Sequence, residues 1–371
     1  MEIYIGTLLV LLLFSFLELR GDFSLRQEKV IRYILFLLLV LQAGLRWETG
    51  TDWYSYFDNF NYTNEVTDVI FAIQAGVEPG YGFFVLFIKQ LTQSYSVFLV
   101  IHALIYYFLI FSANKKLSPF PYISLIVFYA STLGFLGSNR QLIALAICLY
   151  ALQYVLEKKA IKFFLLIGLA FLFHTTAILF CVFYFLNRNI KKNLIIVGLV
   201  LAFVIGKTNF PLMLFSYVGG LLGGVNLLKA EFYAEGAKTV LSENALNLFG
   251  LIKRILFILL FLWNYKFLSS KLKYYKLLFN GYVFGLFFYF LFSSTLLILV
   301  SRGSLYFNVM ECFLLSSQFL ILKKRIEKFY FLILLFTVSV FLLFQSIAIY
   351  VDLFIPYKGI FINTAFFRYM Y

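Results

Sequence analysis

Apolar runs of about 20 residues recur along almost the whole chain, and charged residues lie mainly in the short segments between them. A helix needs about 20 apolar residues to cross a bilayer, whereas a membrane β-barrel alternates apolar and polar residues. Hydrophobic residues make up 63% and charged residues 13% of the 371 residues, which is more apolar surface than a soluble core could bury. The sequence therefore predicts an all-α polytopic membrane protein, with about 10–12 transmembrane helices in one integral membrane domain over residues 1–371.

The positions of the basic residues predict which loops are cytoplasmic. Lys and Arg form clusters between the apolar runs: Arg20/Arg26/Lys29/Arg32, Lys115/Lys116, Lys158/Lys159/Lys162, Arg188/Lys191/Lys192, Lys266/Lys271/Lys273/Lys276 and Lys323/Lys324/Arg325/Lys328. Such clusters mark cytoplasmic loops by the positive-inside rule, and contact with anionic lipid is a second role for them. The net charge of +14 therefore indicates topology in a lipid bilayer and not a nucleic-acid partner.

Threading the chain through these clusters places both termini and the acidic segment 47–80 on the outer side. The predicted helices lie at about 3–19, 30–46, 94–113, 119–137, 139–157, 193–207, 245–266, 276–300, 304–323 and 328–350. Residues 81–92 are too few to cross the bilayer and predict a re-entrant or interfacial helix. Residues 208–245 form a second external loop, to which the sequence assigns no role.

The segment 161–187 is apolar but has basic clusters on both sides, so both of its ends are expected in the cytoplasm. It holds too few apolar residues for two ordinary crossings. We expect two half-helices that meet at His174-Thr175-Thr176, because non-helical backbone at membrane depth needs cover from protein or water. This arrangement places His174 at the edge of an outward-facing polar cavity, whereas the alternative of one tilted span breaks the charge rule at 266–276.

A polar segment on the outer side carries the strongest candidate for a functional site. It runs from Arg46 through Trp47, Glu48, Thr49, Gly50, Thr51, Asp52 and Trp53 to Tyr54, and Glu78-Pro79-Gly80-Tyr81 follows later. Ionisable residues are costly in a membrane protein and are usually kept for function, although a solvated loop has the same composition. We therefore treat Asp52 and Glu78 as candidate catalytic groups.

Isolated cations map to the same outer side. They are Arg46, Arg140, Arg254, Arg302 and Lys358. Each one alone is explained by snorkelling of its charge to the lipid headgroups. Several together indicate an anionic ligand, and the arginine fork suits a diphosphate because it forms two parallel hydrogen bonds.

Short motifs in a fixed order resemble those of the EpsG family of Wzy-type membrane polysaccharide polymerases. They are Arg-x-x-x-Gly-Thr-Asp-Trp-x-x-Tyr at 46–56, Glu-Pro-Gly-Tyr at 78–81, Arg-Gln at 140–141, Phe-His-Thr-Thr-Ala at 173–177 and Pro-Tyr at 356–357. The resemblance covers essentially the whole chain. Glu48-Thr49 before Gly50 departs from the expected pattern, which has more apolar residues there.

The resemblance implies that polyprenyl-diphosphate-linked oligosaccharide repeat units are polymerised into exopolysaccharide, capsule or O-antigen. The reaction takes place at the outer face of the bacterial cytoplasmic membrane, and the enzyme is of glycosyltransferase type with a lipid-linked donor. The implied partners are the lipid-linked oligosaccharides, the bilayer, a chain-length regulator and a flippase.

In that reaction Arg140, Arg254 and Arg302, with Arg46 next, are expected to stabilise the diphosphate leaving group. Asp52, Glu78 and His174 are the unranked candidates for the base that takes the proton of the acceptor hydroxyl. Aromatic rings suited to stacking on sugars are Trp47, Trp53, Tyr81 and Tyr357, and anchoring at the membrane interface is an equal explanation for them.

Other classes have less support. The motifs of ATPases, zinc proteases and serine hydrolases are absent from the sequence, so neither a cofactor nor a metal is expected. The alternatives are a flippase or other transporter of lipid-linked sugars and a membrane O-acyltransferase. Transporters usually contain internal repeats and bind near the bilayer midplane, whereas no repeat is visible here and the charges map to the outer face.

Overall fold

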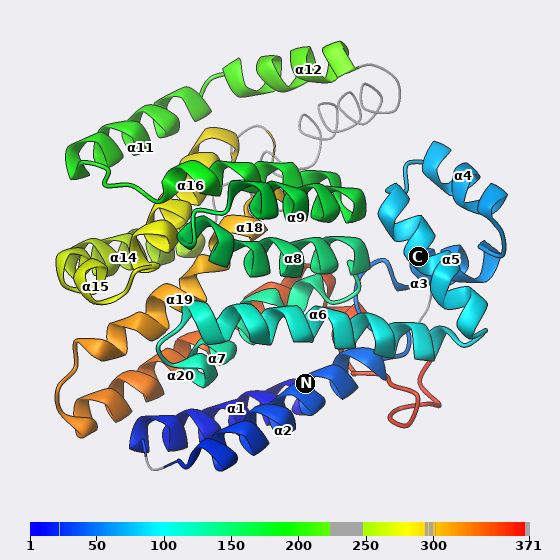
Figure 1. The fold of residues 1–371 in the computed structure, drawn as a ribbon, viewed down its shortest axis with the longest axis horizontal. Helices are drawn as coiled ribbons and strands as arrows, with labels where there is room; N and C mark the ends of the chain where they lie inside the picture. The colour runs from blue at the N-terminus through cyan, green and yellow to red at the C-terminus, as the bar shows by residue number, and fades with distance from the viewer. Residues whose placement is uncertain (22, 223–247, 294–295, 297–299, 301, 368–371) are drawn as a thin grey trace. The chain divides into compact units, whose positions relative to one another are not determined.

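The computed structural model describes residues 1–371 except 22, 223–247, 294–295, 297–299, 301 and 368–371 (Figure 1). Helices dominate it, and isolated bridges at Arg46, Gly359 and Ile362 are the only β-type pairing among the described residues. The chain divides into two compact units, Met1–Ile178 with Leu315–Tyr371 and Leu179–Leu314. The predicted all-α class is confirmed.

The first unit contains most of the long helices. Its α-helices, long and short, are α1 (Glu2–Arg20), α2 (Leu25–Gly44), α3 (Trp53–Tyr62), α4 (Val66–Gln74), α5 (Pro79–Leu91), α6 (Tyr95–Leu117), α7 (Pro121–Thr132), α8 (Asn139–Leu156), α9 (Ala160–Phe173), α20 (Arg325–Ile347) and α21 (Val351–Phe354). In Figure 1, α2, α6, α8 and α9 lie side by side in that order. Helix α7 packs against α1 and α20, so every long helix of this unit has at least one long neighbour.

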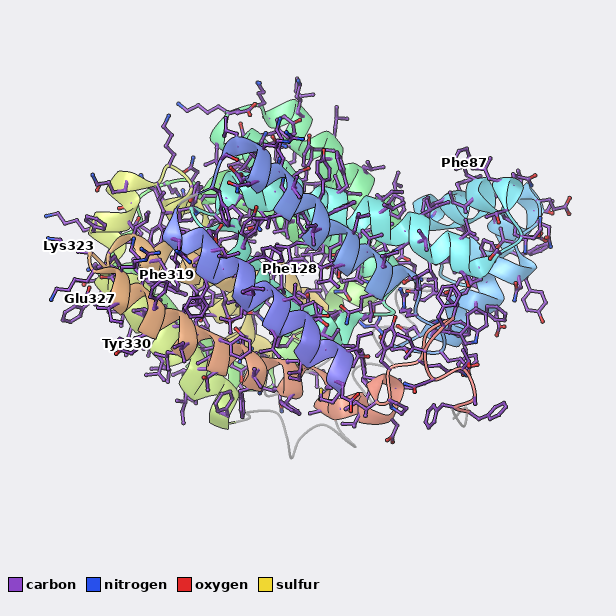
Figure 2. The ribbon with its side chains drawn as sticks, turned by 90° about the horizontal axis from the view of Figure 1, so that it is seen from below. Phe87, Phe128, Phe319, Lys323, Glu327 and Tyr330 are labelled. Atoms are coloured by element: carbon purple, nitrogen blue, oxygen red, sulfur yellow. The ribbon has the colours of Figure 1, made fainter. Side chains whose placement is uncertain are left out.

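Side chains follow this packing. Figure 2 shows Phe128 of α7 among the helices of the first unit, where it is buried. The same view shows Lys323, Glu327 and Tyr330 on the outside around the start of α20, and Tyr330 is exposed. Exposed aromatic and aliphatic residues on a helix are expected where lipid takes the place of water.

The short helices α3, α4 and α5 gather at the end of α6 where that helix begins (Figure 1). Helix α5 has 13 residues, about 20 Å of length, so its prediction as a helix too short to cross is confirmed. The segment 47–80, predicted as a loop, in fact contains α3 and α4. Helix α4 begins with a capping box between Glu65 and Asp68. Some acidic side chains of this segment therefore accept hydrogen bonds from backbone amides.

A C-terminal strap, residues 353–362, lies along residues 45–51. Gly50 N donates to Leu353 O at 2.9 Å, and Trp47 N donates to Lys358 O at 2.9 Å. The strap thereby fixes the segment that leads from α2 into α3.

The predicted break in the segment 161–187 is confirmed. Helix α9 ends at Phe173, His174 adopts an extended backbone with φ −158°, and a 3-10 helix, η2, begins at Thr175 and ends at Val182. A single regular span through this region does not fit, because the helical hydrogen-bond pattern stops at His174.

The second unit contains α10 (Phe183–Leu186), α11 (Lys192–Gly206), α12 (Phe210–Leu222), α14 (Leu248–Trp263), α15 (Tyr265–Lys271), α16 (Tyr275–Phe292) and α18 (Leu305–Asn308). Helix α11 packs against α16, and α11 and α12 meet at an angle of 82°. The unit boundaries fall inside η2 and inside α19 (Met310–Ser317). The predicted loop 208–245 therefore includes helix α12, and its residues 223–245 lie outside the described part of the chain.

Among the described residues, five helices are long and apolar enough to cross a membrane. They are Glu2–Arg20, Tyr95–Leu117, Asn139–Leu156, Tyr275–Phe292 and Arg325–Phe354, and the bent pair α11–α12 makes a sixth if it is counted as one span. The protein is thus a multi-pass membrane protein by length and composition. The larger predicted number includes shorter and broken segments, such as 304–323, which forms α18, α19 and a 3-10 turn.

Candidate functional site

Glu78 and Arg140 form an ion pair in the first unit, with Arg140 Nη1 at 2.6 Å from Glu78 Oε2. Glu78 immediately precedes α5, and Arg140 is the second residue of α8. The amino end of a helix is an unfavourable place for a cation because the helix dipole is positive there. The nearby carboxylate compensates for this, and it is itself nine-tenths buried.

Two further oxygen atoms hold the Arg140 guanidinium. Its Nε donates to Tyr56 Oη at 3.1 Å, and Nη1 also lies 3.5 Å from Gly76 O. Burial raises the pKa of Tyr56, so its phenol stays neutral and can accept this hydrogen bond. Among the described residues Nη2 of Arg140 forms no hydrogen bond, which leaves one donor of the fork for an anionic ligand.

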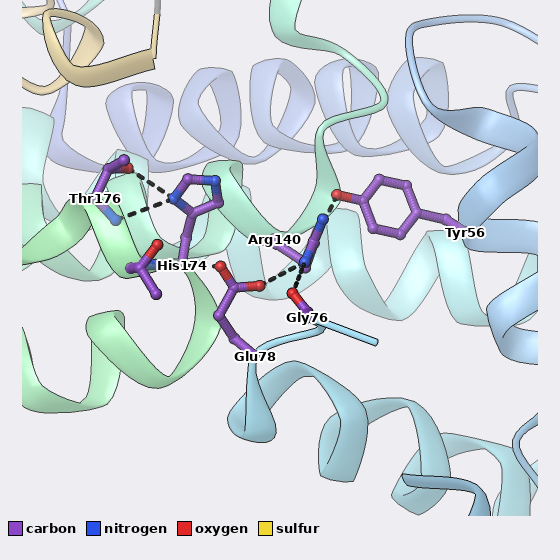
Figure 3. Close-up of polar contacts among 7 residues, drawn as sticks. Tyr56, Gly76, Glu78, Arg140, His174 and Thr176 are labelled. Carbon is purple, nitrogen blue, oxygen red and sulfur yellow. Dashed lines mark hydrogen bonds and ion pairs between the residues drawn. The ribbon is translucent and has the colours of Figure 1, made fainter. Parts of the chain in front are cut away.

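The break after α9 brings His174 to the same place (Figure 3). Thr175 N donates to Glu78 Oε1 at 3.3 Å, so the two oxygens of this carboxylate face Arg140 and the break. His174 is buried, with 8% of its surface exposed. Glu78 thus lies between Arg140 and the break that contains His174, and the roles predicted for these three residues stay predictions.

Contacts with Thr176 decide the tautomer of His174. Thr176 N donates to His174 Nδ1 at 3.3 Å, and Thr176 Oγ1 lies 2.7 Å from the same nitrogen. An amide N–H can only donate, so Nδ1 is the acceptor and the proton of the neutral ring is on Nε2. In this arrangement Nε2 of His174 carries the ring proton.

Asp52 differs from the other acidic candidate in its exposure. Its side chain is exposed, its backbone is left-handed with φ 56°, and it is the residue that precedes α3. Its carbonyl accepts from Tyr56 N at 3.1 Å, which places it one turn before the tyrosine that binds Arg140. Both oxygens of Glu78 already accept hydrogen bonds, whereas the side chain of Asp52 is exposed to solvent.

Two loops approach closely beside this site. Thr51 N donates to Leu136 O at 3.0 Å, and Gly137 has φ 112°. A Cβ on Gly137 would lie 1.9 Å from Thr51 O, so this position requires glycine. The contact links the Gly-Thr-Asp motif to the residues that immediately precede Arg140.

Arg46 lies inside the first unit, with 1% of its surface exposed. Nη1 donates to Ala43 O at 2.5 Å, and Nη2 donates to Asn139 Oδ1 at 2.7 Å. In the described part of the chain it has no ion pair, and Nε has no hydrogen-bond partner. Burial lowers the pKa of Arg46. The geometry therefore makes Arg46 a support for Asn139, the residue before Arg140, and its predicted binding of diphosphate stays a prediction.

The aromatic candidates divide into two groups. Trp53 and Tyr81 are almost completely buried, and Trp53 stacks on Phe57 with ring centroids 5.0 Å apart. Tyr357 is also buried and donates to Gln42 O at 2.7 Å. These three rings support the fold, and stacking on a sugar would require them to leave their contacts.

Trp47 is the candidate with exposed ring surface. It lines a cavity of about 280 Å³ together with Lys358, Gly359, Ile360 and Thr364 of the C-terminal region. Lys358 forms an ion pair of 2.5 Å with Glu48. The cavity therefore combines an aromatic ring with polar groups, and the predicted role of Trp47 in stacking on a sugar stays a prediction.

Arg254 and Arg302 belong to the second unit. Arg254 stacks over the ring of Tyr289 at 3.8 Å and donates to Gly250 O at 2.9 Å, and Arg302 is exposed. In the same unit Lys253 pairs with the buried Glu311 at 2.9 Å. The predicted convergence of these arginines with Arg140 stays a prediction.

Some site residues have no role in the sequence analysis. Tyr56 lies inside the Gly-Thr-Asp-Trp-x-x-Tyr motif, so the motif contained the signal. Thr176 follows His174 in the motif at 173–177, and only the structure shows that it binds the ring. Glu311 is the single acidic residue in the predicted span 304–323, which is the usual mark of a paired charge.

Comparison with known proteins gives one match. The model of the EpsG family matches residues 29–359, a range that includes every residue of the site. No curated protein and no solved structure matches the chain.

Proposed function

The chain belongs to the EpsG family, which implies a membrane polysaccharide polymerase-type role, and we propose that it joins lipid-linked oligosaccharide repeats at the outer face of the bacterial cytoplasmic membrane. The donor is the growing glycan on polyprenyl diphosphate, and the acceptor is the terminal sugar of another lipid-linked repeat. The product is an exopolysaccharide, a capsule or an O-antigen.

The observation that carries this proposal is the arrangement of Glu78, Arg140 and His174. Among the described residues Nη2 of Arg140 forms no hydrogen bond, and Glu78 joins this arginine to Thr175 N at the break beside His174. A preorganised guanidinium donor suits a group that gains negative charge as the reaction proceeds. A diphosphate that leaves the anomeric carbon is such a group.

In the proposed step, a hydroxyl oxygen of the acceptor attacks the anomeric carbon of the donor glycan. The new carbon–oxygen bond forms as the bond between that carbon and the diphosphate oxygen breaks. The hydroxyl proton passes to the Asp52 carboxylate, which is exposed and lies one turn before Tyr56. The polyprenyl diphosphate leaves with both electrons of the broken bond, so no nucleotide is required.

Glu78 has a positioning role in this proposal. Its carboxylate accepts from Arg140 on one side and from Thr175 N on the other, so it fixes the distance between the arginine and the break at His174. Arg46 positions the same helix start from inside, through Asn139. Trp47, which lines the cavity beside Lys358, stacks on a sugar of the substrate.

A strain in which the chromosomal copy carries Arg140→Lys tests the proposal in cells. A lysine keeps the charge but loses the fork, so polymer should fall by about 10²-fold or more at normal protein level. Single repeat units should accumulate on the outer leaflet or on the terminal acceptor. Accumulation of repeats on the cytoplasmic leaflet instead would show that the protein is the flippase, and full polymer would remove Arg140 from the reaction.

A further inference from the structure

A groove between α2 and α6 lies far from the polar site. It encloses about 280 Å³, and an edge-to-face pair of Phe36 and Phe111, with ring centroids 5.6 Å apart, forms its floor. Tyr33 and Phe108 form its sides and are 65% and 62% exposed. The groove is therefore apolar and open along the face of the two helices.

Two cations close one end of the groove. Arg32 lies about two turns into α2, and Lys115 lies in the last turn of α6. They are the ionisable side chains that line it, apart from the phenol of Tyr33. The result is an amphipathic site with positive charge at one end and aromatic rings along its length.

Two acidic residues lie near these cations, but neither of them lines the groove. Glu28 lies 3.9 Å from Arg32, and its side chain is half-exposed, so this pair is weak. Glu18 and Glu28 line an adjoining cavity of about 300 Å³ that shares Arg32, Phe111 and Lys115 with the groove, and the Glu18 carboxylate there accepts from Tyr122 N and Ile123 N at 3.1 Å. Neither carboxylate lines the groove itself.

We propose that this groove binds an anionic phospholipid, with its phosphate between Arg32 and Lys115 and an acyl chain along the Phe36–Phe111 floor. A phosphate diester supplies the negative charge that the two cations face. The hydrocarbon chain covers aromatic surface that the helices leave exposed. The groove is independent of the proposed polymerase reaction, so either proposal stands without the other.

The position of the groove favours a phospholipid over the lipid-linked substrate. Tyr95, at the start of α6, belongs to the aromatic cluster that contains Trp53 and Tyr81, beside the polar site. Lys115 lies near the other end of this 23-residue helix, about 30 Å away, which is the thickness of the hydrocarbon layer. The polyprenyl diphosphate of the proposed reaction would lie at the first end. The second end carries Lys115 and Lys116, one of the basic clusters that mark cytoplasmic loops.

Binding can be measured on the full chain in nanodiscs that contain phosphatidylcholine with a minor fraction of phosphatidylglycerol. Native mass spectrometry of the released protein should show bound phosphatidylglycerol in excess of its mole fraction. The double variant Arg32→Gln/Lys115→Gln should lower its affinity by about 30-fold, roughly fivefold for each cation.

The matched control is Arg26→Gln/Lys29→Gln. It removes two positive charges, as the test variant does, from exposed positions outside the groove in the basic cluster that contains Arg32. It should change the affinity by less than about twofold. Equal losses in the two double variants would overturn the proposal, because they would indicate only a general surface charge. Glu28→Gln should act in the opposite direction and tighten binding, since it removes the carboxylate beside Arg32.

A second measurement does not depend on the charge variants. Phe108→Trp places a fluorescent reporter in the side of the groove. Phosphatidylglycerol with brominated acyl chains should quench the added fluorescence more than brominated phosphatidylcholine at the same mole fraction. Equal quenching by the two lipids would show that the groove has no preference for an anionic headgroup and would refute the proposal.

Discussion

Glu78 Oε2 and Arg140 Nη1 lie 2.6 Å apart although 62 residues separate them in the chain. The pair joins the start of α5 to the start of α8, and the second carboxylate oxygen reaches the break after α9. One side chain thus connects three segments of the first unit. Because the carboxylate is nine-tenths buried, the loss of its partner leaves a charge in a place of low solvation.

Removal of either member of this pair should destabilise the protein. Glu78→Gln and Arg140→Gln should each cost about 1–3 kcal/mol, and the double variant should cost less than the sum of the two, because no unpaired charge remains. Thermal unfolding in one detergent measures all four proteins of this cycle. Additive losses would show that the two charges are not coupled.

Gly137 should tolerate no side chain. Gly137→Ala places a Cβ 1.9 Å from Thr51 O at a φ of 112°, so the Gly-Thr-Asp loop must move away from the start of α8. We expect a loss of more than about 2 kcal/mol in stability together with most of the activity. Gly168→Ala is the control, since a Cβ at that helical position meets nothing within 4 Å. It should be neutral or slightly stabilising, and equal losses at the two positions would exclude a specific loop contact.

The orientation of the His174 ring can be tested through its neighbour. Thr176→Val keeps the size of the side chain and removes the hydroxyl that lies 2.7 Å from Nδ1. One lost hydrogen bond should slow polymerisation by about fivefold or more, because the hydroxyl no longer holds the ring in place. Thr337→Val, at an exposed position of α20, is the matched control and should keep full activity. A normal rate in Thr176→Val would show that the orientation of the ring is set elsewhere.

His174 itself should accept a substitution that preserves the donor. The amide nitrogen of glutamine reaches about as far as Nε2, so His174→Gln should retain more activity than His174→Ala. If both variants are equally inactive, a ring that titrates is required, and His174 is the base in place of Asp52.

Asp52 is expected to act in the transition state and not in binding. Asp52→Asn keeps the size and the left-handed backbone preference, so the fold and KM should change little. The value of kcat should fall by about 10²-fold or more, as expected for the loss of a general base. Initial rates over a range of lipid-linked acceptor concentrations give both constants. A higher KM with unchanged kcat would assign Asp52 to binding alone.

Local sequence patterns were sufficient to predict part of the fold. The helical class follows from the apolar runs, and the break at His174 follows from a segment too short for two crossings between two basic clusters. The short helix α5 follows from its length and from Pro79 at its start. Glu78, Arg140 and His174 were each predicted as site residues from topology and family motifs, and the structure shows that Glu78 contacts Arg140 and the residue after His174.

Long-range pairing could not be predicted from the same patterns. The C-terminal strap binds residues 45–51 through backbone hydrogen bonds, which leave no signal in residue type. For the same reason the burial of Arg46 and Trp53 was not foreseen, since both belong to a segment that is polar and short. Helices α3 and α4 were missed because acidic residues that cap a helix resemble those of a solvated loop.

Reconstitution is the most direct measurement of the central claim, that lipid-linked repeats are polymerised with Arg140 at the diphosphate. The purified protein in liposomes, given only polyprenyl-diphosphate-linked repeats, should lengthen them and release one polyprenyl diphosphate for each new linkage. Arg140→Lys should lose most of this activity because the fork geometry is lost, whereas Arg188→Lys, at an exposed position outside the site, should keep it. Repeats that cross the liposome membrane without being joined, or a fully active Arg140→Lys protein, would contradict the account.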